Sequence, residues 1–436
     1  MYKTVKFGGS SLADAAQFQK VRNIILSDDA RRYVVVSAPG KRYKGDDKIT
    51  DLLYECQRLA QSGAPFDHVF GRIERRYLQI RDKLGLKTDL ESELSDIRHI
   101  IENGASPDYA ASRGEYLNAR LMADYLGIPF VDASELICFH DDGTYDDETT
   151  QARTRVLKKY ERAVIPGFYG KRRDGSVRTF SRGGSDITGA IVARATESTL
   201  YENWTDVDGF LMADPRIVPD AKVIDVVTYS ELRELSYMGA TVLHEDSIFP
   251  VRKARIPINV RNTNRPEVNG TLIVPDVMSK PDRDCPLTGV AGSRGFTVIT
   301  LQKDNMNSEP GFAFRLLGIF YKHGVSVETM PCGIDTMSVV ASDAQLKGKL
   351  DAIYHDMMIE CMPDMVEIAS CIALIATVGI GMVRSRGTAA KIFTALADAD
   401  VNVRVIDQGS SEMNIIIGVE QRDFERAIEA IYRKFA

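Results

Sequence analysis

Short apolar runs alternate with stretches of helical periodicity over residues 1 to about 280, and this alternation limits the fold more than any other feature of the sequence. The runs are closed by Gly, Ser, Pro or Asp, and they predict strands at 5–7, 33–37, 128–132, 174–180 (a hairpin), 200–203 and 258–261. Strands separated by helices favour an α/β fold with a mainly parallel central sheet. Ligands of such folds bind beyond the carboxyl ends of the strands, so the functional residues are expected directly after them.

Residues 50–127 contain almost only apolar residues at helical spacing. This pattern predicts a helical insertion beside the sheet. Such a block could close over a substrate, or it could be a packed helical cover.

The C-terminal part contains two similar units that follow a proline-rich stretch at 275–287. Each unit reads as strand, helix, strand, strand, helix, which is close to the ferredoxin-like plan. The pattern predicts a domain at 1–280, a linker with a strand at 281–293, and two small domains at 294–370 and 371–436. The second unit is one strand short, so the strand at 287–291 is expected to complete its sheet and to make the first unit an insertion into the second.

The composition excludes several classes of protein. Hydrophobic residues make up 44 % and charged residues 27 % of the 436, which is typical of a globular protein. A net charge of −6 argues against nucleic acid as a partner, because a phosphate backbone requires a basic face. No apolar run is long enough for a membrane span, and the six cysteines form no CxxC pair, so a cytoplasmic protein with reduced thiols is expected. The six histidines are scattered, so no metal site of the protein's own is expected.

A glycine pair follows the first predicted strand, in the sequence KFGGSS at 6–11. Gly8 and Gly9 let backbone N–H groups approach an anion, the next helix adds its positive N-terminus, and Lys6 can contribute a charge. These features indicate a phosphate site. The alternative is a structural turn in which Ser10 or Ser11 caps the helix.

A second glycine pair, in SRGGSD at 181–186, again lies between a strand and a helix. Two such loops in one domain favour anion binding over a chance turn. Arg182 can hold a carboxylate through two parallel hydrogen bonds, and Asp186 lies in the first turn of the helix.

The third motif is WTDVDG at 204–209, which is followed by Asp214 and Arg216. By spacing alone, Asp206 and Asp208 could equally be capping residues of a turn.

Together these motifs resemble those of the aspartate kinases, members of the amino acid kinase family. The resemblance extends from end to end, and its motifs in order are KFGGSS (6–11), VVVSA (34–38), IT (49–50), SRGE (112–115), PGFYG (166–170), SRGGSD (181–186) and WTDVDG (204–209). The two C-terminal units resemble the ACT pair with which that family senses amino acids. The resemblance therefore implies the amino acid kinase fold with two C-terminal ferredoxin-like ACT domains.

The resemblance implies an enzyme that transfers a phosphoryl group from ATP to the side-chain carboxylate of L-aspartate, the first step toward lysine, threonine and methionine. Mg²⁺ would be carried by the nucleotide. Catalytic roles fall on Lys6, Arg182 and Asp186. The implied nucleotide site consists of Lys6, Gly8, Gly9, Ser10, Thr205, Asp206, Asp214 and Arg216. The implied aspartate site consists of Ser37, Thr50, Glu115, Arg182, Gly183, Gly184 and Ser185, with Glu115 on the substrate ammonium.

An effector site is implied where a turn before a helix faces the strand at 325–328. Its residues would be Gly311, Phe312, Val327 and Glu328. Lysine is favoured as the inhibitor because Glu328 could meet its second ammonium, and threonine is the other candidate. ACT sheets usually pair edge to edge, so a homodimer or a higher homo-oligomer is expected.

Two positions depart from the family. An aromatic residue commonly precedes the Asp-Pro-Arg segment at 214–216, and here Leu211 stands near it. Many relatives carry a lysine near the phosphates where this chain has Thr241. This loss leaves one alternative function, a non-catalytic amino acid sensor that has kept the kinase fold.

Overall fold

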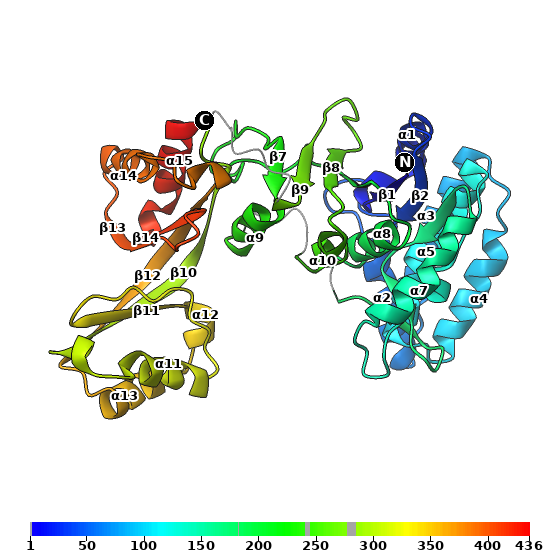
Figure 1. Ribbon diagram of the computed structural model, residues 1–436. Helices are drawn as coiled ribbons and strands as arrows, with labels where there is room; N and C mark the ends of the chain where they lie inside the picture. Colours follow the sequence, from blue (N-terminus) through cyan, green and yellow to red (C-terminus); the bar gives the residue numbers. More distant parts are fainter. Residues whose placement is uncertain (1, 182, 240–244, 277–284) are drawn as a thin grey trace. The chain divides into compact units, whose positions relative to one another are not determined.

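The computed structural model describes residues 2–181, 183–239, 245–276 and 285–436, and the chain forms two compact units (Figure 1). Unit 1 comprises Met1–Phe210, Val223–Tyr229 and Thr241–Ser279. Unit 2 comprises Leu211–Lys222, Ser230–Ala240 and Lys280–Ala436. The chain therefore passes from one unit to the other several times.

A seven-stranded sheet forms the centre of unit 1, in the order β3-β2-β1-β6-β8-β9-β7. Neighbouring strands from β3 to β8 are parallel, and β9 is antiparallel to β8. The prediction of a mainly parallel sheet is confirmed. The strands are β1 (Lys3–Phe7), β2 (Arg31–Val36), β3 (Ala163–Pro166), β6 (Leu200–Thr205), β7 (Val226–Thr228), β8 (Ile258–Asn262) and β9 (Thr271–Val274), with a separate hairpin of β4 (Tyr169–Lys171) and β5 (Val177–Thr179).

The strand predicted at 128–132 is wrong. Only Phe130 forms an isolated bridge there, to Val164. Pro129 lacks the N–H that a strand needs, and β3 takes the place beside β2 instead. The strand β3, Ala163–Pro166, had not been predicted.

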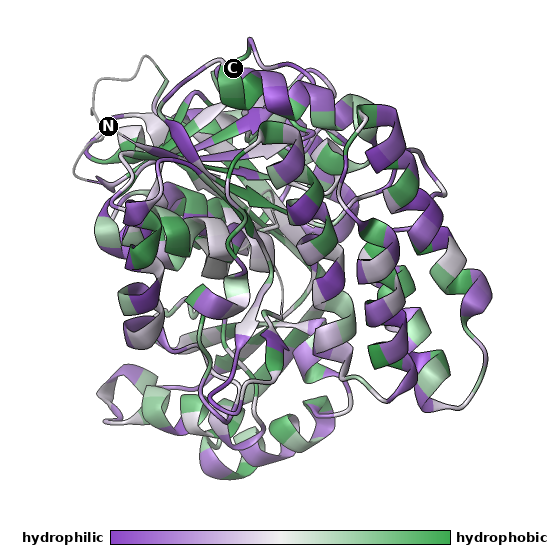
Figure 2. Cartoon of the chain, turned by 90° about the vertical axis from the view of Figure 1, so that its right-hand side faces the viewer, coloured by the Kyte–Doolittle hydropathy of each residue, from purple (hydrophilic) through white to green (hydrophobic). Residues whose placement is uncertain are grey.

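Helices cover the sheet of unit 1, and the predicted helical insertion is confirmed as α2 to α5. Figure 2 shows that these helices carry both apolar and polar residues, as expected for helices with one buried face. The helices are α1 (Ala15–Leu26), α2 (Ile49–Gln61), α3 (Asp67–Leu84), α4 (Leu90–Glu102), α5 (Pro107–Leu126), α6 (Ala133–Leu136), α7 (Asp147–Thr154), α8 (Gly184–Ala195) and α10 (Glu245–Ala254).

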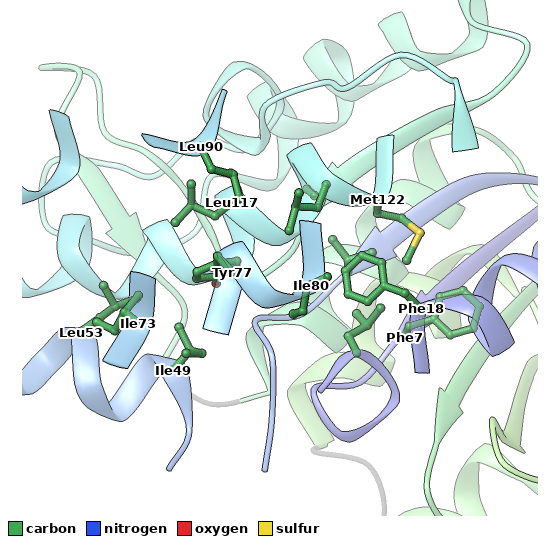
Figure 3. Packing of buried hydrophobic residues seen from close by; sticks show 14 of the residues in the cluster. Phe7, Phe18, Ile49, Leu53, Ile73, Tyr77, Ile80, Leu90, Leu117 and Met122 are labelled. Atoms are coloured by element: carbon green, nitrogen blue, oxygen red, sulfur yellow. The ribbon is translucent and has the colours of Figure 1, made fainter. Parts of the chain in front are cut away.

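The longest of these helices, α5, has clear start and stop signals. Ser106 accepts a hydrogen bond from the Tyr109 N–H, Pro107 occupies the first turn, and Gly127 ends the helix at a φ of 66°. Its apolar residues Leu117 and Met122 are fully buried with Phe7 and Phe18 in the core that joins the insertion to the sheet (Figure 3).

Unit 2 is built on a five-stranded sheet in the order β11-β10-β12-β14-β13. Two strands, β10 and β12, are 14 residues long and pair antiparallel along their length. The first part of β10, from Gly289 to Arg294, lies opposite Val378 to Ala373 of β12. The elements are β10 (Gly289–Gln302), α11 (Phe312–Lys322), β11 (Thr336–Ser342), α12 (Asp343–Leu346), α13 (Leu350–Glu360), β12 (Met365–Val378), α14 (Thr388–Asp398), β13 (Val403–Asp407), β14 (Asn414–Glu420) and α15 (Phe424–Phe435), with α9 (Tyr229–Tyr237) joining them from residue 230 on.

The strand expected at 325–328 is not formed as a regular element, and no regular strand continues from it to Met330. Thr329 makes an isolated bridge to Val340, and the Glu328 N–H donates to the Val340 carbonyl at 2.8 Å. The segment thus follows the edge strand β11 only briefly, and Pro331 comes directly after it.

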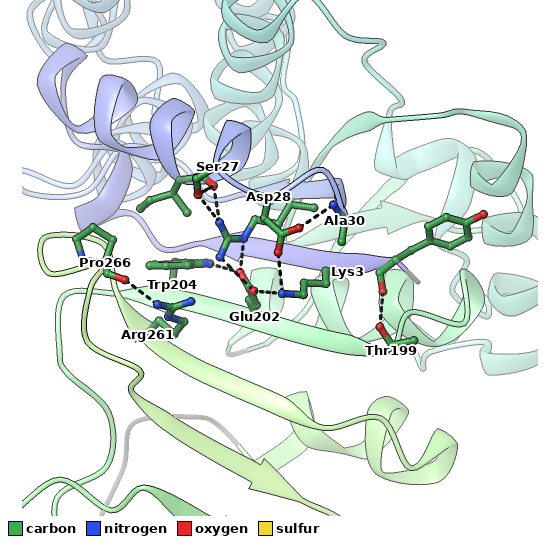
Figure 4. A network of polar contacts seen from close by, with 12 residues as sticks. Lys3, Ser27, Asp28, Ala30, Thr199, Glu202, Trp204, Arg261 and Pro266 are labelled. Carbon is green, nitrogen blue, oxygen red and sulfur yellow. Dashed lines mark hydrogen bonds and ion pairs between the residues drawn. The ribbon is translucent and has the colours of Figure 1, made fainter.

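A buried carboxylate ties the three central strands of unit 1 together (Figure 4). Glu202 on β6 is 1 % exposed and accepts from Arg31 Nε at 2.8 Å, from Lys3 Nζ at 3.3 Å and from Trp204 Nε1 at 2.9 Å. Arg31 begins β2 and Lys3 begins β1. Removing one partner of such a buried pair leaves the other charges uncompensated.

Replacing Glu202 with Ala is therefore expected to lower the free energy of unfolding of unit 1 by roughly 3–5 kcal/mol. Urea denaturation followed by the fluorescence of Trp204, the one tryptophan of the chain, would measure the change. Glu91→Ala is the control, because Glu91 pairs with Arg81 at the surface and should change stability little. Equal stability of the two variants would contradict the prediction.

Candidate active site

The predicted site residues of unit 1 gather at the carboxyl ends of β1, β2 and β6. Phe7 at the end of β1 lies opposite Val36 of β2 and Trp204 of β6. Parallel pairing thus brings the residues that follow these strands, Gly8, Ser37 and Thr205, to one edge of the sheet.

The glycine pair forms a tight turn between β1 and the 3₁₀ helix Ser10–Leu12. The Gly8 N–H donates to the Trp204 carbonyl at 2.9 Å, and the Gly9 carbonyl accepts from the Gly40 N–H at 2.8 Å. A Cβ atom on Gly40 would lie 2.6 Å from the Gly9 carbonyl carbon, so neither backbone has room for a side chain there. Gly40 lies directly against this turn, and it had not been singled out from the sequence.

Lys6 lies at the centre of this edge, paired with Asp186. The distance from Lys6 Nζ to Asp186 Oδ1 is 2.5 Å, and their side chains are 9 % and 18 % exposed. Asn203 of β6 bonds to both, accepting from Lys6 at 3.4 Å and donating to Asp186 at 2.9 Å. Asn203 was missed by sequence reasoning, although a polar residue inside a buried strand is a signal of function.

The start of α8 lies against the PGFYG segment at 166–170. Gly183 precedes the helix at a φ of 58°, a conformation that favours glycine. A Cβ on Gly184 would lie 2.5 Å from the Phe168 ring, and Ser185 packs against Gly167 and is buried. The structure thus brings the second glycine pair close to Asp186, while Arg182 lies outside the described residues.

Glu115 is a buried carboxyl on α5 with one oxygen left without a partner. Its side chain is 5 % exposed, and its Oε2 atom has no hydrogen-bond partner among the residues that the structure describes. Burial raises the pKa of Glu115 to about 8, against smaller lowering effects of the Ala38 N–H and of Arg113. A buried carboxyl of this kind can meet an ammonium group.

Arg113 lies two residues before Glu115 on α5, and it forms no ion pair with a carboxylate in the described part of the chain. Its guanidinium lies 4.8, 4.6 and 5.3 Å from the ring centroids of Tyr109, Tyr116 and Tyr169. This aromatic cage fixes a cation beside Glu115 through cation–π contacts.

The remaining residues of the predicted aspartate site lie on β2 and α2. Ser37 follows β2 and is half-buried, and its carbonyl accepts from the Asn118 side chain of α5 at 2.7 Å. Thr50 is half-buried in the first turn of α2. Asn118 had not been singled out from the sequence.

The two acids of WTDVDG differ in their surroundings. Asp206 is exposed and accepts from the Thr205 hydroxyl at 3.2 Å. Asp208 is held by Asn262 at 2.8 Å and by Arg265, so it fixes the turn.

Two predicted nucleotide residues, Asp214 and Arg216, belong to unit 2, where Arg216 Nη2 lies 2.5 Å from Asp214 Oδ2. Thr241 lies outside the described residues. Within the described ranges, no group of three or more His, Cys, Asp and Glu side chains is placed to hold a metal ion.

Of the predicted effector residues, Gly311 and Phe312 lie at the start of α11, and Val327 and Glu328 follow its C-terminal end. Gly311 precedes the helix at a φ of 81°, Phe312 is buried, and Val327 is half-buried. Glu328 accepts a hydrogen bond from the Tyr237 hydroxyl at 2.6 Å, and this bond raises the pKa of Tyr237 to about 12. Tyr237 ends α9 and had not been predicted to approach this region.

The site of unit 1 can therefore hold an anion at the glycine turn and a cation at Glu115, which suits phosphoryl transfer to an amino acid. Comparison with known proteins shows which family the chain belongs to. Residues 1–262 match the amino acid kinase family, and residues 375–435 match the ACT domain. Aspartokinase 3 of Bacillus subtilis is 38 % identical over 453 residues, covering 99 % of this chain and 98 % of the relative. The chain belongs to the aspartokinase family.

Solved structures of the aspartokinase family agree. The Clostridium acetobutylicum aspartate kinase is 51 % identical, with a TM-score of 0.93 and complete coverage of both chains. Aspartokinase III of E. coli, solved with aspartate and ADP, is 26 % identical with a TM-score of 0.72, covering 100 % of this chain and 99 % of that one. The same E. coli enzyme has also been solved with lysine and aspartate.

The activity follows from the family: the chain is an aspartokinase that uses ATP to phosphorylate the side-chain carboxylate of aspartate. The alternative of a non-catalytic sensor is not favoured. In the described part of the chain, no helix is both long enough and apolar enough to span a membrane.

The raised pKa of Glu115 predicts a pH-dependent stability of the ligand-free protein. Between the ordinary carboxyl pKa of 4.5 and about 8, the folded protein holds a proton that the unfolded chain has lost, so stability should fall as the pH rises through this range. Glu115→Gln removes the buried charge. Its melting temperature should equal that of the wild type at pH 5 and exceed it at pH 9, as measured by calorimetry, and a difference that is constant with pH would contradict the assignment.

Proposed function

We propose that phosphoryl transfer takes place at the carboxyl ends of β1, β2 and β6, with Lys6 on the β- and γ-phosphates. The support is the ion pair of Lys6 with Asp186 beside the glycine turn, Gly8 to Ser10, which leads into the 3₁₀ helix. Lys6 is held in place before the nucleotide arrives, and a phosphate can then replace Asp186 as its partner. A preorganised cation of this kind stabilises the charge of the transferred group.

The observation that carries the substrate assignment is the unpartnered buried oxygen of Glu115. An α-ammonium group would complete its hydrogen bonds and offset the cost of burying its charge. We assign the substrate carboxylate to Arg182 and the lining of the site to Ser37, Thr50 and the Gly183–Ser185 turn.

The nucleotide is assigned to Lys6, the glycine turn, and the residues Thr205, Asp206, Asp214 and Arg216. Mg²⁺ bound to ATP would neutralise phosphate charge, and it usually takes one or two carboxylates from the protein. Asp186 and the exposed Asp206 are carboxylates of the right type at this edge of the sheet. Asp186 would help to order the phosphate and metal region.

Two substitutions test these roles separately. Lys6→Met should lower kcat by roughly 10²-fold or more, because it removes charge stabilisation of the transition state. Glu115→Gln should raise KM for aspartate and leave KM for ATP unchanged, because it removes only the contact with the substrate ammonium. Initial rates from a coupled ADP-release assay measure both effects. A near-normal kcat for Lys6→Met, or an effect of Glu115→Gln confined to ATP, would show that the roles are wrong.

We also propose that residues 1–280 form the catalytic domain and that 294–370 and 371–436 form the two ACT domains. The segment 281–293 would be a linker and a strand of the second ACT sheet, which the pairing of Gly289–Arg294 with the second half of β12 supports. The six free cysteines support a reducing, cytoplasmic environment.

Lysine is the proposed inhibitor, bound between the Gly311–Phe312 turn and Glu328. The N–H groups at the start of α11 would take its carboxylate, and Glu328 would take its side-chain ammonium. The hydrogen bond from Tyr237 shows that Glu328 is accessible to a donor from outside its own segment.

Glu328→Ala is therefore expected to weaken inhibition by lysine at least tenfold, because a charge-assisted bond is lost. Tyr237→Phe is the matched variant, and it should leave lysine inhibition intact or strengthen it because lysine no longer competes with the tyrosine hydroxyl. Initial rates against lysine, threonine and both together measure these effects. A lysine-insensitive wild type, or undiminished lysine inhibition in Glu328→Ala, would contradict the proposal.

The proposed assembly is a homodimer through the first ACT domain. Phe314 and Tyr321 on α11 are 80 % and 87 % exposed, and Ile359 on α13 is 60 % exposed, which is unusual for a surface that stays free.

The double substitution Phe314→Asp with Tyr321→Asp should therefore yield a monomer in sedimentation analysis, since two buried carboxylates oppose the contact. Leu26→Asp, at an exposed apolar residue of α1 in unit 1, is the control and should not change the mass. A dimer that survives the double substitution would place the interface elsewhere.

A further inference from the structure

A cavity of about 230 Å³ lies beside the loop that joins β2 to α2, next to α3. Arginines dominate its lining. The lining residues are Arg42, Tyr43, Asp46, Asp47, Leu52, Arg72, Arg75, Arg76 and Gln79. None of these residues belongs to the proposed aspartate or nucleotide site.

Two of the arginines share one carboxylate. Arg42 donates to Asp46 at 2.8 and 3.0 Å, and Arg76 donates to it at 2.7 Å. Arg42 first, and Arg76 after it, hold the pKa of Asp46 well below its usual range. Asp46 is therefore charged at any physiological pH. Its single negative charge still offsets only one of the two positive charges of Arg42 and Arg76.

The other two arginines line the more open part of the cavity. Arg72 pairs with Asp47, and both are about two-fifths exposed. Arg75 donates to the Gly71 carbonyl at 3.0 Å and forms no ion pair among the described residues. The lining thus contains four guanidinium groups and two carboxylates, an excess of two positive charges.

Burial makes this excess costly. Arg76 is 6 % exposed, and burial together with the charge of Arg42 lowers its pKa. Asp14, at the start of α1, lies close enough to Arg42 to favour its charge, but it is not part of the lining. An anion in the cavity would compensate charge that the protein leaves unbalanced.

We propose that this cavity is a second ligand site that binds a small dianion, either a phosphate group or a dicarboxylate. Arg72 and Arg75 would form the direct contacts, because guanidinium groups match both ligands through paired hydrogen bonds. Arg42 and the Gln79 amide complete a lining of donors around them. Phosphate and dicarboxylate share this chemistry, and the experiment below distinguishes them.

A short chain of contacts links the cavity to the glycine turn. Arg76 Nη1 donates to the Gly40 carbonyl at 3.0 Å, and the Gly40 N–H donates to the Gly9 carbonyl at 2.8 Å. The same arginine therefore borders the cavity and fixes the backbone behind the phosphate turn. An anion that draws Arg76 and Arg42 toward the cavity would act on the turn through this connection.

Calorimetric titration tests the site with inorganic phosphate and, separately, with malonate at constant ionic strength. ADP and aspartate are left out because they carry the same phosphate and dicarboxylate groups, and any anion bound at the active site is common to the wild type and the variants. The wild type should bind at least one of the two anions, and Arg75→Gln should bind it at least tenfold more weakly. Asp47→Asn should bind it more tightly, because it frees Arg72 from its carboxylate. Arg58→Gln, an exposed arginine of α2 outside the lining, is the matched control and should bind like the wild type.

The outcomes separate cleanly. A preference for phosphate or for malonate identifies the source of the ligand, and either supports the site. No binding of either anion by the wild type, or equal affinities of wild type and Arg75→Gln, would overturn the proposal. Damage to the fold cannot raise the affinity of Asp47→Asn for the anion. If this variant does not bind the anion more tightly than the wild type, that result also counts against the site.

Discussion

The contact of Gly9 with Gly40 is the constraint on which the rest of the site depends. The two backbones approach so closely that a single Cβ atom would collide with a main-chain carbon. Because of this contact, the turn after β1 lies directly on the loop after β2. The Gly9 carbonyl accepts its hydrogen bond from the backbone N–H of Gly40 instead of from water. The backbone of the proposed phosphate turn is thus fixed by packing that does not depend on side-chain rotamers.

Buried charged groups of unit 1 differ in how completely the protein pairs them. Glu202 is buried with three donors and is fully compensated. Glu115, in contrast, retains an oxygen without a described partner, and Arg113 is surrounded by rings rather than by carboxylates. A protein selected for stability alone would gain from pairing such groups. Their retention at one edge of the sheet is typical of a site that completes its electrostatics with a ligand.

Much of this could be predicted from the sequence, because the decisive signals are local. Strand, glycine pair and helix follow one another within about ten residues, so KFGGSS and SRGGSD could be recognised without knowing what surrounds them. Asn203, Gly40 and Asn118 could not, because each acts on a partner that is distant along the chain and carries no motif of its own. Tyr237 was missed for a further reason: the predicted boundary near 280 assigns it to the first domain, while the structure groups it with the second unit.

That grouping has a consequence for how the chain folds as it is made. Leu211–Lys222 and Ser230–Ala240 belong to unit 2, and their side chains Val218, Leu232 and Leu235 are almost fully buried. Val218 packs with Val290, Ile375 and Tyr432, and Leu235 lies against Gly289. On the ribosome these two segments emerge long before their partners have been translated. Their apolar residues therefore stay exposed until the C-terminal part has been made. A chain that stopped after residue 280 would keep them exposed permanently, and the regulatory half is therefore not an appendage that a simple truncation could remove.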